Sequence, residues 1–207
     1  MTTYFETTKR LELFLEGIRA AAYAEPESPL HTQVTQEVWD RVRPKMELPI
    51  AGTVLDVGCG SGVAMKLFRE YALKVTGITC VREEFEAVEK RFPGAVQFLD
   101  MHDIGIYEGY ADLIWCRHCL EHSPMPAFWL QQAHRAIKEE GWLYVEVPAP
   151  NTACRHETNP SHHFVAGKAM WESLFFRSNF AVADSFEVNF TTSLGPDIYY
   201  CWLLKRR

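Results

Sequence analysis

The feature that most constrains the fold is a run at positions 53–62, TVLDVGCGSG. It begins with apolar residues around Asp56, which predicts a short buried strand, and continues into glycines at alternate positions. Glycine has no Cβ and adopts backbone angles closed to other residues, so such a turn lets a ligand approach the backbone. A helix over 63–71 would point its free N–H groups at the same place, which suits a carboxylate or a phosphate. The run therefore predicts a strand, a ligand-binding turn and a helix, and a purely structural turn is the alternative.

Short apolar segments alternate with amphipathic ones from residue 53 onward, which is typical of parallel strands joined by helices. The apolar segments predict strands near 53–57, 73–78, 95–99, 111–115 and 142–147. The amphipathic segments predict helices near 63–71, 82–92, 125–138 and 168–178. Two last strands, at 180–186 and 198–204, have a Gly195-Pro196 turn and no helix between them, so we expect an antiparallel pair at one edge of the sheet. The predicted class is α/β.

The N-terminal part has a different pattern. Apolar side chains recur at helical spacing over 4–24 and again over 34–42, and the segment between them is a linker with two prolines. We therefore divide the chain into a helical cap at 1–48 and a main domain at 49–207. The cap either covers one edge of the sheet or helps to shape a substrate pocket.

Composition and net charge limit the kinds of molecule that we expect the chain to bind. The net charge of −6 argues against a nucleic-acid backbone as the main partner, because affinity for phosphates comes largely from clustered Lys and Arg. The first ten residues lack the apolar core of a signal peptide, and no later run has the eighteen or so apolar residues of a spanning helix. We expect a cytoplasmic protein that does not enter a membrane, with free thiols at its six cysteines and an oligomeric state left open between monomer and homodimer.

The motif Asp56-x-Gly58-x-Gly60-x-Gly62 resembles motif I of the class I S-adenosylmethionine-dependent methyltransferases. A nicotinamide or flavin fold has Gly-x-Gly-x-x-Gly instead, and its third glycine would fall on Val63. The order of predicted elements is similar to that family too, so the resemblance covers about 50–205. It implies a Rossmann-like, doubly wound and mostly parallel seven-stranded sheet with a closing antiparallel hairpin.

The resemblance also implies S-adenosylmethionine as cofactor, held at the strand ends. The implied cofactor contacts are Asp56, Gly58, Cys59, Gly60, Gly62, Thr79, Asp100, Met101, Cys116 and Arg117. In this scheme the glycine turn and Asp56 contact the methionine part, while Asp100 accepts the adenine amino group and Met101 packs on the ring. Asp103 is the alternative acceptor. Thr79 stands where the family has an acidic residue for the ribose hydroxyls, so Glu83 or Glu84 would have to reach in, or ribose binding is weaker.

The acceptor side is predicted from the end of the fourth strand. There the chain reads HCLEH at 118–122, which is similar to a His-x-Leu-Glu-His segment of small-molecule methyltransferases. His118 or His122 is a candidate base, because imidazole titrates near neutral pH, and the alternative is that each holds the loop. We expect Glu121, His162 and His163 to contact the acceptor. The loop at 152–167 also has the residue types for a divalent metal, but similar enzymes have histidines there without one, and we assign no metal.

The leading hypothesis is a methyltransferase that acts on an oxygen atom of a small molecule. The Asn/Asp-Pro-Pro-aromatic signature of many nitrogen methyltransferases is missing after the fourth strand. A sulfonium methyl group is already activated, so transfer requires mainly alignment and exclusion of water. The alternatives are a non-catalytic binding protein with this fold, which the threonine at position 79 favours, and another transferase that uses the same cofactor.

Overall fold

The computed structural model describes residues 2–24 and 27–207, with side chains from Glu6 onward. Its α-helices are α1 (Thr2–Ala20), α2 (Pro29–Val42), α3 (Val63–Glu70), α4 (Arg82–Arg91), α5 (Pro126–Ala136) and α6 (Lys168–Arg177). Its strands are β1 (Thr53–Val57), β2 (Lys74–Thr79), β3 (Val96–Phe98), β4 (Ala111–Arg117), β5 (Ile137–Pro148), β6 (Phe180–Thr192) and β7 (Gly195–Arg206). Short 3₁₀ helices occupy Arg43–Lys45, Met101–Tyr107, Leu120–His122 and His156–Thr158.

The strands form one seven-stranded sheet in the order β3-β2-β1-β4-β5-β7-β6. The five strands β1 to β5 are parallel, and β7 runs antiparallel to both of its neighbours. This confirms the predicted doubly wound sheet with an antiparallel hairpin at its edge. The chain order reverses between β1 and β4, where ligands bind in open parallel sheets.

Helices cover the two faces of the sheet, so the central strands are buried on both sides. On one face, Trp39 of α2 and Phe68 of α3 pack against Trp115 of β4. On the other, residues of α5 and α6 such as Trp129 and Trp171 form a second cluster. Double coverage explains why β1 and β4 have mostly apolar residues on both faces and not a strict alternation of apolar and polar ones.

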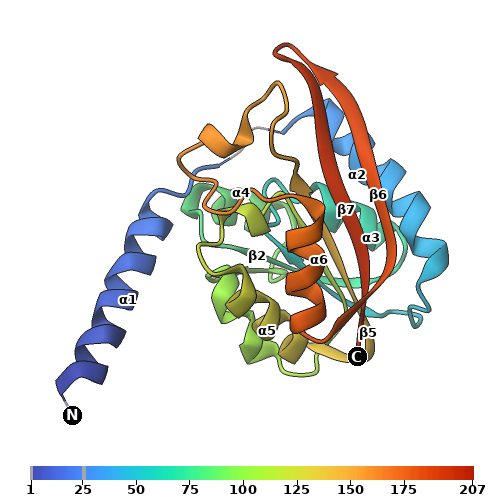
Figure 1. Ribbon diagram of the computed structural model, residues 1–207. Coiled ribbons are helices and arrows are strands. Elements are labelled where there is room, and N and C mark those ends of the chain that lie inside the picture. The colour runs from blue at the N-terminus through green and yellow to red at the C-terminus, as the bar shows by residue number, and fades with distance from the viewer. Residues whose placement is uncertain (1, 25–26) are drawn as a thin grey trace.

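The hairpin differs from its predicted bounds. Gly195 and Pro196 lie within β7, paired with Thr192 and Thr191, so the predicted turn at these two residues was wrong. The hairpin is also longer than the predicted strands (Figure 1). β6 is an edge strand whose outward side chains are exposed, and its outer part therefore has a weak apolar signal.

The N-terminal helices take up different positions. Figure 1 shows α1 extending away from the rest of the molecule, and Leu11 and Phe14, which the sequence suggested as part of an apolar stripe, are exposed on it. By contrast, α2 packs against α3 through Trp39. Within the described residues, no helix is both long enough and apolar enough to cross a membrane. The domain boundary after residue 48 stays a prediction.

Candidate cofactor and acceptor pocket

A cavity of about 220 Å³ opens at the carboxyl ends of the parallel strands. The glycine turn, the end of β2, the loop after β3 and the end of β4 form most of its wall. The end of α1, the segment after it and the start of α2 close the remaining side, through residues that include Ile18, Tyr23 and His31. The cavity therefore lies where the sheet topology predicts a ligand, and the N-terminal segment contributes to it.

The three glycines of the turn have different reasons to lack a side chain. A Cβ on Gly58 would lie 2.6 Å from Cys119 Sγ, and one on Gly62 would lie 2.9 Å from the ring of Phe92. A Cβ on Gly60 would meet nothing nearer than Glu84, 4.0 Å away. The expectation that all three leave room for a ligand needs correction, because Gly58 and Gly62 make room for the protein's own side chains. Gly60 faces open space in the cavity wall.

Asp56 is the penultimate residue of β1, close to this turn, and is buried. Its Oδ2 has no hydrogen-bond partner among the residues that the structure describes. Burial raises the pKa of the Asp56 carboxyl to about 7, and Arg117 partly opposes this shift. A buried carboxylate oxygen that lines a cavity and is otherwise unpaired fits a positively charged group of a ligand.

Thr79 and Glu84 together line the next part of the cavity. Thr79 Oγ1 donates a hydrogen bond to Glu84 Oε2 at 2.7 Å and accepts one from the Val81 N–H. Glu84 lies on the first turns of α4, whereas the neighbouring Glu83 is exposed and outside the cavity wall. Of the two carboxylates suggested as substitutes for the missing acidic residue, the one at the cavity is Glu84.

Asp100 and Met101 line the cavity after β3. Asp100 caps the 3₁₀ helix: its Oδ1 accepts the His102 N–H at 2.8 Å and lies 2.7 Å from His102 Nδ1. Its Oδ2 is 3.4 Å from Arg19 Nε at the end of α1. The carboxylate is therefore partly engaged within the protein already. Asp103, the alternative adenine partner, is exposed and does not line the cavity.

A buried ionic network lies behind the ends of β4 and β5. Arg117 Nε donates to Glu146 Oε1 at 2.7 Å, and Tyr144 donates to Glu146 Oε2 at 2.7 Å. Arg117 Nη1 also donates to Thr35 Oγ1 of α2 at 3.1 Å. Burial would raise the pKa of Glu146, but Arg117 and His118 outweigh it and lower this pKa to about 2. The Glu146 carboxyl group in this network is therefore ionised at neutral pH.

His118 lies between two carboxylates. Its Nε2 is 3.0 Å from Glu146 Oε1 and its Nδ1 is 3.4 Å from Glu121 Oε1. Burial favours the neutral imidazole, but the contacts with Glu121 and Glu146 outweigh it and raise the pKa of His118 to about 9. An imidazole that is protonated at neutral pH cannot accept a proton, so this geometry argues against His118 as a general base.

Most of the predicted site residues line the cavity, but not all of them do. His122 and His163 line it together with the residues described above. Four predicted contacts are not part of its wall: Gly62, Cys116, Glu121 and His162. Gly62 packs against Phe92, Cys116 is in the sheet core, and the last two lie beside each other behind His122. All six cysteines are free thiols, as expected.

Two contributors to this site were missed by sequence reasoning. Glu146 is a charged residue inside a buried apolar strand, a pattern that could have marked it. Arg19 has no such signal, because its contact with Asp100 joins residues far apart in the chain.

Comparison with known proteins gives the family. Residues 27–187 match the model of a family described as methyltransferase domain. A ubiquinone biosynthesis O-methyltransferase from Nitrosomonas europaea is 29% identical over 98 residues, which cover 44% of this chain and 42% of the relative. A 27-O-demethylrifamycin SV methyltransferase from Amycolatopsis mediterranei is 25% identical over 140 residues, 62% of this chain and 52% of the relative. These matches span about half or less of the relatives' own length.

Solved structures show the same fold. A putative sarcosine dimethylglycine methyltransferase from Galdieria sulphuraria superposes with a TM-score of 0.72 at 13% identity, covering 93% of this chain and 97% of the other. A 1,6-didemethyltoxoflavin-N1-methyltransferase from Burkholderia thailandensis, with bound S-adenosylhomocysteine, gives a TM-score of 0.64 at 16% identity, covering 89% and 93%. At such identities the likeness concerns the fold alone.

Proposed function

The chain belongs to the methyltransferase domain family, and on that premise we propose that it transfers a methyl group to an oxygen atom of a small-molecule acceptor. The cofactor of this family is S-adenosylmethionine, which supplies a sulfonium methyl group already activated for transfer. The acceptor oxygen is proposed because several similar proteins are named as O-methyltransferases. The net charge of −6 favours a small molecule over a nucleic acid.

One observation carries the proposal: Asp56, whose buried Oδ2 has no partner among the described residues, lines the cavity next to the open face of Gly60. Asp56 would bind the cofactor's ammonium group, and the N–H groups at the start of α3 suit its carboxylate. We assign the ribose hydroxyls to Glu84, which Thr79 orients by its hydrogen bond, and the adenine to Asp100 and Met101. The residues present therefore fit the cofactor.

The acceptor would bind where His122 and His163 meet the N-terminal segment. We propose residues 1–48 as a cap on this side, supported by Ile18, Tyr23 and His31 in the cavity wall. His122 stays the candidate base, because the two carboxylates beside His118 hold that imidazole protonated. The protein's main contribution is to align the acceptor and to exclude water.

Replacing Gly60 tests the cofactor site. Gly60→Val would place its side chain in the open part of the cavity wall, and we expect calorimetry to show loss of S-adenosylmethionine binding. Gly94→Val is the matched control, because Gly94 also has a positive φ and open space but does not line the cavity. Unchanged affinity in folded Gly60→Val protein would refute the proposed position of the cofactor.

A further inference from the structure

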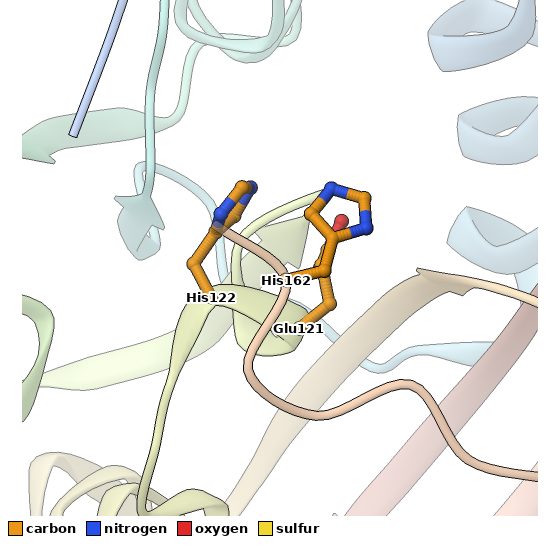
Figure 2. A group of neighbouring side chains, drawn as sticks. All are labelled: Glu121, His122 and His162. Atoms are coloured by element: carbon orange, nitrogen blue, oxygen red, sulfur yellow. The ribbon is translucent and has the colours of Figure 1, made fainter. Parts of the chain in front are cut away.

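Three side chains with metal-binding atoms meet behind the acceptor side of the cavity. Glu121 and His122 lie in the 3₁₀ turn after β4, and His162 lies in the long loop between β5 and α6. Figure 2 shows the three side chains close together, although they come from segments about forty residues apart. One potential ligand atom from each residue lies within 4.8 Å of those from the other two. This grouping is a product of the tertiary structure.

Two hydrogen bonds fix the loop on either side of His162. His122 Nδ1 is 2.9 Å from the Ser161 carbonyl oxygen, and the Phe164 N–H donates to the Glu121 carbonyl oxygen at 3.0 Å. A carbonyl oxygen can only accept, so Nδ1 of His122 carries the proton in this bond. Its Nε2 is then the atom that offers a lone pair. This is the arrangement in which a second hydrogen bond orients a metal-binding histidine.

Two polar atoms in this group lack partners. Glu121 Oε2 and His162 Nδ1 are both buried with no hydrogen-bond partner in the described ranges 2–24 and 27–207. The Glu121 side chain is 1% exposed, and only its other oxygen faces His118. A buried carboxylate oxygen without a partner is costly, and because His118 faces only Oε1, Oε2 is the atom left to bind a ligand beside the two imidazoles.

We propose that Glu121, His122 and His162 bind a divalent transition-metal ion of the zinc class, with an open coordination position for the hydroxyl oxygen of the acceptor. Two imidazoles and one carboxylate are a ligand set of catalytic zinc, which leaves a fourth position for water or substrate. Zinc ligands at about 2.1 Å in a tetrahedron are roughly 3.4 Å apart, so separations of up to 4.8 Å need to contract by up to about 1.4 Å.

The use of the ion for the acceptor rests on the proposed function. His122 and Ser161 line the cavity, so an ion bound beside His122 is next to the acceptor side. A bound divalent ion lowers the pKa of a coordinated hydroxyl group, whose proton then passes to solvent water. The ion would therefore activate an oxygen acceptor in place of a general base, and His122, whose Nε2 would bind the ion, would act as its ligand and not as the base.

A second group of similar composition does not have the same features. Cys154, His156 and Asp197 also lie within reach of one another. However, His156 Nε2 is 3.0 Å from Asp197 Oδ2, and Asp197 Oδ1 accepts the Ile198 N–H. Its polar atoms already have partners, which is the pattern of an ordinary buried ion pair. It serves as an internal comparison in the test.

The test measures Zn²⁺ binding to the full chain by calorimetry and by metal analysis after dialysis, without cofactor or acceptor. We expect one Zn²⁺ per chain, and binding weakened at least about 100-fold in His162→Ala and in Glu121→Gln. Glu121→Gln keeps the shape of the side chain and guards against misfolding as the cause, which circular dichroism also checks. His134→Ala, at a histidine on α5 outside this group, should bind as the parent does.

The outcomes of this test distinguish the proposed metal site from the proposed methyltransferase function. No Zn²⁺ binding by the parent, binding unaffected by both ligand variants, or binding lost in His156→Ala but kept in His162→Ala would each overturn the metal site. S-adenosylmethionine binding is measured on the same samples. Loss of Zn²⁺ with the cofactor affinity kept in His162→Ala supports the site, whereas a parent that binds Zn²⁺ but no cofactor retains the metal site and refutes the proposed methyltransferase.

Discussion

Asp56 is expected to lower the stability of the free protein and to strengthen the binding of the cofactor. Its carboxyl is buried, and burial raises its pKa to about 7. Because this is above the value of about 3.9 in an unfolded chain, the folded protein holds more protons between about pH 4 and 7. The stability of the free protein therefore falls as the pH rises through this window. Such a loss of folding stability is common at residues that bind a ligand.

Asp56→Asn should separate the effect of Asp56 on folding stability from its effect on cofactor binding. At pH 8 we expect a higher Tm for the free variant than for the parent, because the variant buries no charge. We also expect binding of S-adenosylmethionine at least about tenfold weaker, because a charge-assisted contact is lost. In the parent, affinity should rise between pH 6 and 8 more than it does in the variant. Thermal unfolding and calorimetry at both pH values measure these effects, and weaker binding together with a lower Tm would point to a structural role.

Glu84 is the residue that we expect to bind the ribose hydroxyls of the cofactor. Glu84→Gln removes the charge while keeping the hydrogen bond to Thr79 possible, and we expect cofactor affinity to fall by roughly tenfold or more. Glu83→Gln is the matched control on the same helical turn, since Glu83 is exposed and outside the cavity wall. Equal losses in the two variants would mean that the general negative charge of α4 matters, rather than the position of Glu84.

At the level of elements, a buried polar contact links α2 to the end of β4. Thr35 Oγ1 accepts a hydrogen bond from Arg117 Nη1 at the end of β4 and itself donates to the His31 carbonyl. The interface also has apolar packing of Trp39 against Phe68 and Trp115, and an exposed ion pair between Arg41 and Asp184 of β6. The contact matters for the site, because Arg117 also holds Glu146 in the network behind the cavity.

Thr35→Val tests this attachment. The valine has a similar shape but leaves a buried guanidinium N–H without its partner, which should cost about 1–3 kcal/mol in the free energy of unfolding. Thr32→Val is the control, because Thr32 lies on the same helix with its side chain exposed. Urea denaturation of both variants gives the comparison. A loss below about 0.5 kcal/mol for Thr35→Val would show that the contact with Arg117 is replaced by water.

For the whole molecule, binding of cofactor should appear as stabilisation. A ligand that binds the folded chain alone, at one hundred times its Kd, stabilises by about 2.7 kcal/mol. For a chain of this size the expected rise in Tm is roughly 5–10 °C. Thermal unfolding with S-adenosylhomocysteine measures it, and Gly60→Val should show no rise. A parent protein that also shows none would favour the alternative of a fold without a working cofactor site.

Much of the fold could be predicted because its signals are local. The buried strands β1 and β4 appear as continuous apolar runs, and the glycine turn after Asp56 identifies the carboxyl end of β1. From these patterns the sequence determined the α/β class, the closing hairpin and the edge of the sheet where the cavity opens. The physical reason is that periodicity and glycine content act on neighbouring residues, before any distant contact forms.

The tertiary structure decided which polar groups meet and in which charge state. Glu146, His118 and Arg117 become one ionic network because β4 and β5 lie side by side, and burial then sets their pKa values. Glu121 faces His162 because a long loop folds back over the end of β4. These contacts join residues about thirty to forty positions apart, and the electrostatic environment exists only when the chain is folded. No local pattern can encode it.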